Sequence, residues 1–103
     1  MDCVPHRKNA LDIAVEILGS KWNLLIIWYL REGALRFTEL KRKMGDVNPG
    51  TVATHLKELE SHGIISRTAY LEMPPRVEYE LTVRGKALLP IFQAICDWSE
   101  AYS

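Results

Sequence analysis

The sequence predicts a mainly helical domain with one small β-hairpin, arranged as a winged helix-turn-helix in the order α-α-α-α-β-β-α. Apolar residues recur at helical spacing before the chain reaches residue 60. Asn48 and Pro49 mark a helix start, because asparagine caps a helix and proline suits its first position. The period then changes at residues 77–81, where apolar and charged side chains alternate as in a half-buried strand.

The composition is that of one globular domain spanning residues 1–103, with 48% hydrophobic and 25% charged residues. Thirteen basic side chains balance thirteen acidic ones, which excludes a polybasic tail but leaves room for a local basic face. The longest unbroken apolar run, residues 24–30, is too short to span a membrane, and residues 1–20 hold no signal-peptide core. We therefore expect a cytoplasmic protein with no membrane partner.

The first two helices are expected at residues 10–18 and 21–31. Gly19 ends the first as a C′ glycine would, and Ser20 can cap the second. The second helix is apolar nearly all round, which places it at the centre of the core. Gly33 follows its end.

Two further helices form the helix-turn-helix. Thr38 is expected to cap a short helix over residues 39–44, and residues 45–47 form the turn. The next helix runs from Pro49 to about residue 62. Its inward stripe is spaced at i, i+4 and i+7 and consists of Val52, Leu56 and Leu59.

The hairpin is expected to pair residues 64–71 with residues 77–81. The segment between them contains two prolines, which cannot donate to a strand ladder, so it forms a stiff tip. Thr82 begins a last helix that reaches about residue 101 and bends at Pro90. Its apolar stripe consists of Leu88, Ile91, Phe92, Ile95, Trp98 and Tyr102.

Several short segments, in this order and spacing, resemble one known family over about residues 10–100. They are Lys21-Trp22, Leu35-Arg36-Phe37, Leu56-Lys57-Glu58-Leu59-Glu60 with Gly63, and Pro74-Pro75-Arg76-Val77-Glu78-Tyr79-Glu80-Leu81-Thr82. Together they resemble the HxlR-type winged-helix transcription regulators, which are related to the MarR type. The resemblance implies a homodimer that binds double-stranded DNA, with the first and last helices making the dimer contact.

The expected DNA surface has three parts. Residues 31–43 carry five basic against two acidic side chains, which suits phosphate contacts, and the alternative is a solvated helix face. The helix from Pro49 should lie in the major groove, with Thr54 and His55 as the best candidates for reading bases and Lys57 for phosphate. Thr51 could instead be satisfied inside the helix. The predicted DNA-binding residues are Arg36, Thr38, Lys41, Arg42, Gly50, Thr51, Thr54, His55, Lys57 and Arg76.

Arg76, at the wing, is the candidate for a narrow minor groove, where negative potential concentrates. The alternative is an ion pair with Glu72 or Glu78 at the base of the wing.

The dimer interface is expected from residues 9–19 and 83–102, whose apolar surface exceeds what a small core can cover. A two-fold dimer would place the recognition helices one DNA turn apart, about 34 Å, on a palindromic operator. The predicted interface residues are Leu11, Val15, Leu18, Phe92, Ile95, Trp98 and Tyr102.

Cys3 is the candidate for a thiol that senses oxidants, because neighbouring basic residues 6–8 would lower its pKa and favour the thiolate. The alternative is an inert terminal thiol, and Cys96 is expected to be a core residue. A small-molecule effector could instead lie between the dimer helices, in a pocket lined by Trp22, Trp28, Phe92 and Trp98.

Other function classes find little support. The Cys, His and Asp residues show no tight metal-ligand spacing, so we expect neither a metal nor another cofactor. The sequence has no phosphate loop, zinc-protease motif or nucleophile elbow, so we expect no enzyme. The main competitor is a winged-helix module that binds another protein, a reading favoured by the zero net charge.

Overall fold

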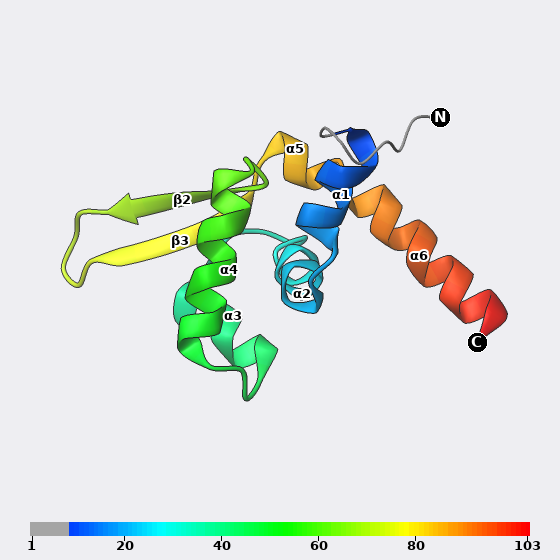
Figure 1. The fold of residues 1–103 in the computed structure, drawn as a ribbon. Helices are drawn as coiled ribbons and strands as arrows, with labels where there is room; N and C mark the ends of the chain where they lie inside the picture. Colours follow the sequence, from blue (N-terminus) through cyan, green and yellow to red (C-terminus); the bar gives the residue numbers. More distant parts are fainter. Residues whose placement is uncertain (1–8) are drawn as a thin grey trace.

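A computed structural model describes residues 9–103 and confirms the mainly helical winged helix-turn-helix (Figure 1). Cys3 lies outside the described residues. The elements, in chain order, are α1 (Ala10–Leu18), α2 (Lys21–Tyr29), β1 (Leu35–Arg36), α3 (Phe37–Met44), α4 (Pro49–Ser61), β2 (Ile65–Tyr70), β3 (Arg76–Leu81), α5 (Val83–Lys86) and α6 (Leu89–Tyr102).

Side-chain caps set the starts of the first two helices. Asn9 Oδ1 accepts from the Asp12 amide at 3.0 Å, and the Asp12 carboxylate accepts from the Asn9 amide at 3.2 Å. Ser20 Oγ accepts from the Trp22 amide at 3.2 Å, as predicted. Gly19 ends α1, but its φ of −78° is not the left-handed conformation typical of a C′ glycine.

The helix-turn-helix differs from the prediction at one end. Helix α3 begins at Phe37, so Thr38 lies in its first turn and does not cap it. The cap position is Arg36, whose amide donates to Glu39 Oε1 at 2.8 Å. Asn48 Oδ1 accepts from the Gly50 amide at 2.7 Å, which confirms the predicted start of α4.

The sheet has three antiparallel strands in the order β1-β3-β2. Strands β2 and β3 pair from Ile65 opposite Leu81 to Tyr70 opposite Arg76, and the hairpin projects from the helical body as a wing (Figure 1). Strand β1, which was not predicted, places Leu35 opposite Tyr79. Two residues are too few to show an alternating pattern.

The last predicted helix is wrong in its continuity. In place of one bent helix over residues 82–101, α5 and α6 are separate helices. Thr82 Oγ1 accepts from the Gly85 amide at 3.1 Å and caps α5 as predicted. Pro90 lies in the first turn of α6, where its missing amide hydrogen is not needed. Helix α6 then extends away from the body (Figure 1).

One residue predicted for the dimer interface, Phe92, is buried in the core instead. Phe92 is only 6% exposed and stacks on Trp28 with ring centroids 6.4 Å apart, because the first turn of α6 still lies against α2. It is therefore a core residue of the monomer. No helix in the described part of the chain is long and apolar enough to cross a membrane. The buried hydrophobic residues are Ile17, Ile26, Ile27, Leu30, Leu40, Met44, Val47, Val52, Leu56, Leu59, Ile64, Ile65, Leu81 and Phe92.

Gly85 tests the packing between α5 and the start of the wing. A Cβ at this position would collide with the main-chain carbonyl of Ile64 and lie 3.1 Å from Leu81 Cδ2. We expect Gly85→Ala to lower the free energy of unfolding in urea by about 1–3 kcal/mol. Val83→Ala, at an exposed position of the same helix, is the control and should change it by less than about 0.5 kcal/mol. An equal effect of both substitutions would contradict this close contact.

Candidate nucleic-acid interface

A buried amide, Asn23 on α2, fixes how helix α4 sits on the core. The Asn23 side chain is 0% exposed. Its Nδ2 donates to the main-chain carbonyl of Ile17 at 2.9 Å and to Glu58 Oε1 at 3.0 Å. Its Oδ1 lies 2.8 Å from His55 Nδ1. Because a buried amide without partners is costly, these bonds hold one side of α4 against α2.

The other faces of α4 differ in their exposure. Val52, Leu56 and Leu59 are buried, as their spacing predicted. Gly50, Thr54 and Lys57 are exposed on the outward face, and Thr51 is half-buried. A surface hollow at the N-terminal half of α4 is lined by Asn48, Gly50, Thr51, Thr54 and His55.

The two predicted base readers are partly occupied within the protein. Thr54 Oγ1 donates to the main-chain carbonyl of Gly50 at 2.8 Å. His55 is half-buried, and its Nδ1 meets Asn23. His55 therefore lies on the flank of α4 that faces α2, and only its Nε2 is left for an outside partner.

The basic segment is divided between internal and outward charges. Lys41 Nζ donates to the Gly45 carbonyl at 2.8 Å, where it stabilises the C-terminal end of α3. Arg36 and Arg42 are exposed, and their side chains have no ion-pair partner among residues 9–103. These two arginines, together with the exposed Lys43, are the outward-facing charges of the segment. Thr38 is exposed beside them.

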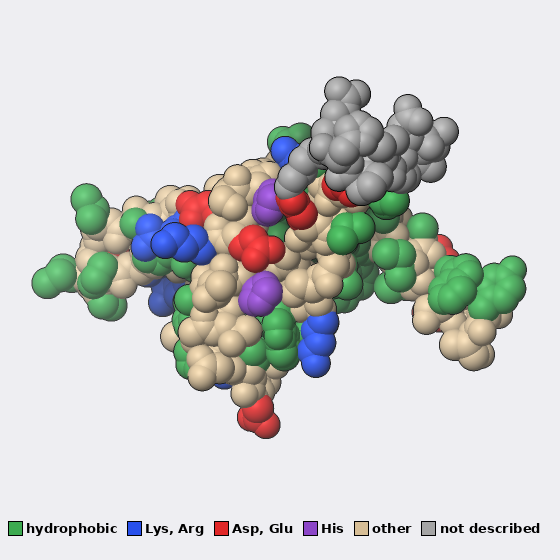
Figure 2. Space-filling view, in the orientation of Figure 1, with side chains coloured by type: hydrophobic (Ala, Val, Ile, Leu, Met, Phe, Trp, Pro, Cys, Tyr) green, Lys and Arg blue, Asp and Glu red, His purple; other side chains and the backbone are tan. Residues whose placement is uncertain are grey.

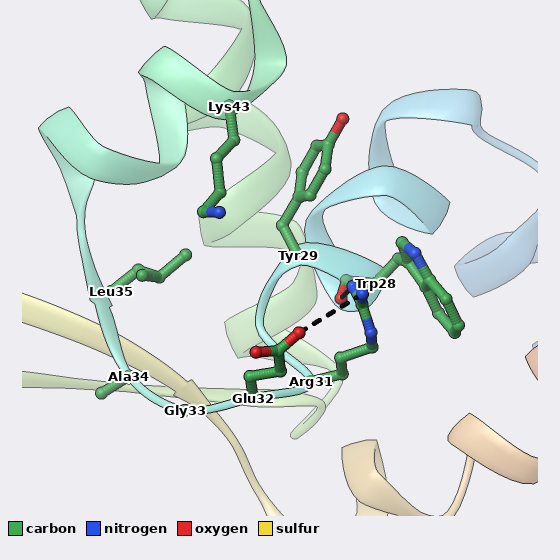
Figure 3. Close-up of a pocket in the computed structure, with 8 residues that line it drawn as sticks. All are labelled: Trp28, Tyr29, Arg31, Glu32, Gly33, Ala34, Leu35 and Lys43. Carbon is green, nitrogen blue, oxygen red and sulfur yellow. Dashed lines mark hydrogen bonds and ion pairs between the residues drawn. The ribbon is translucent and has the colours of Figure 1, made fainter.

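Arg31 is held by its neighbours, as Figure 3 shows. Its Nη1 donates to the Trp28 carbonyl at 2.9 Å, and its guanidinium lies 4.1 Å from the centre of the Trp28 ring. Its Nη2 is 3.4 Å from Glu32 Oε1. Arg31 and Glu32 line a surface hollow at the end of α2, and Lys43 extends from α3 into this hollow (Figure 3). The internal bonds of Arg31 reduce the charge that the segment offers to a partner.

Arg76 makes the ion pairs that the sequence left open as an alternative. Its Nη1 lies 2.9 Å from Glu72 Oε1, and its Nε lies 3.3 Å from Glu78 Oε2. The guanidinium also covers the Tyr70 ring at 4.2 Å, and the side chain is 30% exposed. A contact with DNA requires Arg76 to exchange these partners.

Sequence reasoning missed Arg67, which is exposed on β2. It lines a hollow between α4 and the wing together with Lys57, Glu60 and Tyr79. Figure 2 shows basic side chains gathered over the hairpin beside α4. The pairing of Arg67 with Tyr79 across the sheet sets this position, and a period-two count along β2 is the signal that could have found it.

A separate apolar surface lies on α1 and α6. Leu11, Ile13 and Val15 are exposed on α1, and Ile91 and Ile95 on α6. Trp98 is 65% exposed and Tyr102 is 76% exposed, and hydrophobic side chains gather at the free end of α6 (Figure 2). Leu18 is half-buried against the core. Most of the predicted interface residues therefore face outward.

An apolar cavity of about 210 Å³ lies between α2 and α6. It is lined by Leu24, Leu25, Trp28, Phe92, Ile95 and Cys96. Of the four aromatic residues predicted to line an effector pocket, Trp28 and Phe92 are present here, and Trp22 and Trp98 are not.

Most of the chain matches the model of one known protein family. The model of the HxlR-like helix-turn-helix family matches residues 17–103. The chain belongs to this family. An HTH-type transcriptional regulator of Methanothermobacter thermautotrophicus is 42% identical to this HxlR-like chain over 93 residues, which cover 90% of the chain and 71% of that protein. The resemblance drawn from the short segments is confirmed.

Solved structures agree with this assignment. A transcriptional regulator assigned to the MarR family, from Porphyromonas gingivalis W83, matches with a TM-score of 0.87 and 32% identity, covering 97% of this chain and 98% of the other. The redox regulator HypR in its oxidized form matches with a TM-score of 0.83 and 30% identity, covering 92% and 98%. The HxlR-like chain is a DNA-binding transcription regulator with a MarR-like winged helix-turn-helix.

Substitutions at Asn23 and His55 should have non-additive effects on the free energy of unfolding. We expect Asn23→Ala to lower the free energy of unfolding by about 1–3 kcal/mol, because it leaves the Ile17 carbonyl without its partner. His55→Ala should cost less, and the double variant should differ from the sum by at least about 0.5 kcal/mol. Urea unfolding measures all three values. Thr54→Ala on the outward face is the control, and strict additivity of the pair would contradict the contact.

Proposed function

We propose that the chain acts as a homodimer on a palindromic operator, with α4 in the major groove and the wing reaching the adjacent minor groove. The observation that carries this proposal is that Lys57 on α4 and Arg67 on β2 line the same hollow between helix and wing. Two cations on both sides of such a hollow suit the sugar-phosphate backbone that separates the two grooves. The proposal gives the chain no catalytic role.

The outward face of α4 suits close contact with base pairs. Gly50 has no side chain, so the backbone can approach the groove edge, and Thr51, Thr54 and His55 line the hollow beside it. Residues 50–58 of α4 include no arginine, asparagine or glutamine, and Asn48 at the start of the helix uses its Oδ1 as the cap, so direct readout is modest and DNA shape contributes more. Arg36, Thr38, Lys41 and Arg42 supply the phosphate side, with Lys41 acting from its position at the end of α3.

The dimer is proposed from α1 and α6. The exposed side chains of Leu11, Val15, Ile95, Trp98 and Tyr102 form apolar surface that a second copy would cover. Helix α6 extends away from the helix-turn-helix (Figure 1), so a dimer joined there leaves α4 and the wing free. Two copies would then present recognition helices about 34 Å apart.

Redox sensing through Cys3 is the second candidate function. The observation that favours it is the likeness to HypR, a protein described as a redox regulator. Cys96, the second thiol, is half-buried on α6. An oxidant is then the effector, whereas the apolar cavity between α2 and α6 would suit an uncharged small molecule.

Binding to the DNA upstream of its own gene tests the main function. We expect the affinity to fall with salt, with a log–log slope of about −0.9 for each phosphate contacted. Lys57→Ala and Arg67→Ala should each reduce the size of that slope by about 1. Fluorescence anisotropy at two salt concentrations, with unrelated DNA for comparison, measures both effects. Arg84→Ala, an exposed position on α5, is the control.

A salt-independent interaction with this DNA, or equal affinity for unrelated DNA, would argue against the operator. A slope unchanged by Lys57→Ala and Arg67→Ala would argue against the proposed docking. In that case a protein partner for α4 and the wing becomes the better account.

Trp98→Glu tests the dimer. A carboxylate on the apolar surface of α6 would have to be buried without a partner, so we expect sedimentation to show a shift from dimer to monomer. Operator affinity should fall with it. Gln93→Glu places the same charge on another face of the helix and should remain dimeric. A dimer in the Trp98→Glu variant would place the interface elsewhere.

Mild oxidation tests the role of Cys3. If Cys3 senses oxidants, mass spectrometry should find a disulfide or mixed disulfide at this residue, and operator binding should change in parallel. A Cys3→Ser variant is the control and should bind the operator equally before and after oxidation. Unchanged binding of the unsubstituted protein, with no adduct at Cys3, would remove this function.

A further inference from the structure

The orientation of the Asn23 amide follows from its partners. The main-chain carbonyl of Ile17, 2.9 Å away, can only accept a hydrogen bond, so the atom that faces it must be Nδ2. The carboxylate of Glu58 accepts from the same Nδ2 at 3.0 Å. The oxygen of the amide, Oδ1, is therefore the atom that faces His55.

This orientation fixes the position of the hydrogen on His55. An amide oxygen can only accept, so His55 Nδ1, at 2.8 Å, must carry the hydrogen and donate it. A neutral imidazole has one N–H, so Nε2 is then a bare acceptor. No residue in the described range 9–103 is hydrogen-bonded to Nε2, and the ring lines the hollow with Gly50, Thr51 and Thr54.

We propose that Asn23 is a positioning residue for base recognition, and that His55 Nε2 accepts a hydrogen bond from an exocyclic amino group in the major groove. This inference rests on the proposed placement of α4 in that groove. Only two bases present an amino group there, adenine through N6 and cytosine through N4. His55 therefore favours adenine or cytosine on the strand it meets and disfavours guanine and thymine.

The preference depends on a residue that never touches DNA. With the other tautomer, Nε2 would carry the hydrogen and could donate to guanine, to thymine O4 or to adenine N7, but it could no longer accept from cytosine N4. The single hydrogen bond from His55 to the buried Asn23 thus decides which class of base is selected. Asn23 also holds the Ile17 carbonyl at the end of α1. The tautomer of His55 is therefore determined by a residue of the core rather than of the surface.

The first experiment reads the tautomer directly, in the full chain without DNA. Long-range proton–nitrogen NMR at pH 8, where an unperturbed imidazole is neutral, distinguishes a protonated from a bare ring nitrogen. We expect His55 to be protonated at Nδ1 and bare at Nε2. His62, which has no side-chain hydrogen bond to another described residue, is the internal control and should show both tautomers in exchange. A His55 ring protonated at Nε2 would overturn the inference.

The second experiment reads the base preference. DNA selected from a randomised library by the unsubstituted chain should hold, in each half-site, one position where adenine or cytosine exceeds guanine and thymine by about fivefold. His55→Ala should abolish this preference, and Asn23→Ser should weaken it, while preferences elsewhere in the site persist. Lys57→Ala is the matched control and should lower affinity without changing any base preference.

The outcomes separate this inference from the proposed function. Selective DNA binding with no position that depends on His55 overturns the inference and leaves the operator function standing. If the unsubstituted chain shows no sequence selectivity for DNA, both the inference and the operator function are overturned. If Asn23→Ser does not fold, the NMR measurement on the unsubstituted chain and the His55→Ala selection still decide the question.

Discussion

The hydrogen bonds of Asn23 are the constraint on which the arrangement of this domain depends. Its buried amide takes partners from the end of α1 and from two successive turns of α4, so it joins three helices at one point. The buried stripe of Val52, Leu56 and Leu59 sets which side of α4 faces the core. The amide adds a directional constraint on the rotation of α4 about its own axis, because each of its polar atoms needs a particular partner. The outward face of α4 is set from inside the core.

Two surfaces with different chemistry lie on opposite sides of this core. Polar and basic side chains line α4 and its contact with the wing, whereas α1 and α6 carry exposed apolar side chains. The net charge of zero is a sum over the whole chain and does not show this division. Arg31 and Arg76 form ion pairs with neighbouring glutamates. Lys57, Arg67, Arg36 and Arg42 remain outward. A chain of 103 residues can therefore join one partner through charge and another through apolar burial.

The sequence predicts the elements whose signals are local. The spacing of Val52, Leu56 and Leu59, and the cap at Asn48, place α4 and its buried face. Features that depend on distant residues were missed. Asn23 looks like one polar residue in an apolar helix, because His55 and Glu58 lie 32 and 35 residues further along the chain. Phe92 shares the spacing of the exposed apolar residues on α6, and only the packing of α2 shows that it is buried. The candidate DNA contacts could be named by type, but not divided into free and internally bonded side chains.

A methylation-protection footprint on the operator tests the central claim most directly, because dimethyl sulfate reports guanine N7 in the major groove. If the core holds α4 outward in a two-fold dimer, two patches of guanines should be protected on one face of the DNA. Their centres should lie one helical turn apart, about 10 base pairs. A single protected patch, or specific binding that leaves every guanine N7 reactive, would contradict the placement of α4 in two successive major grooves.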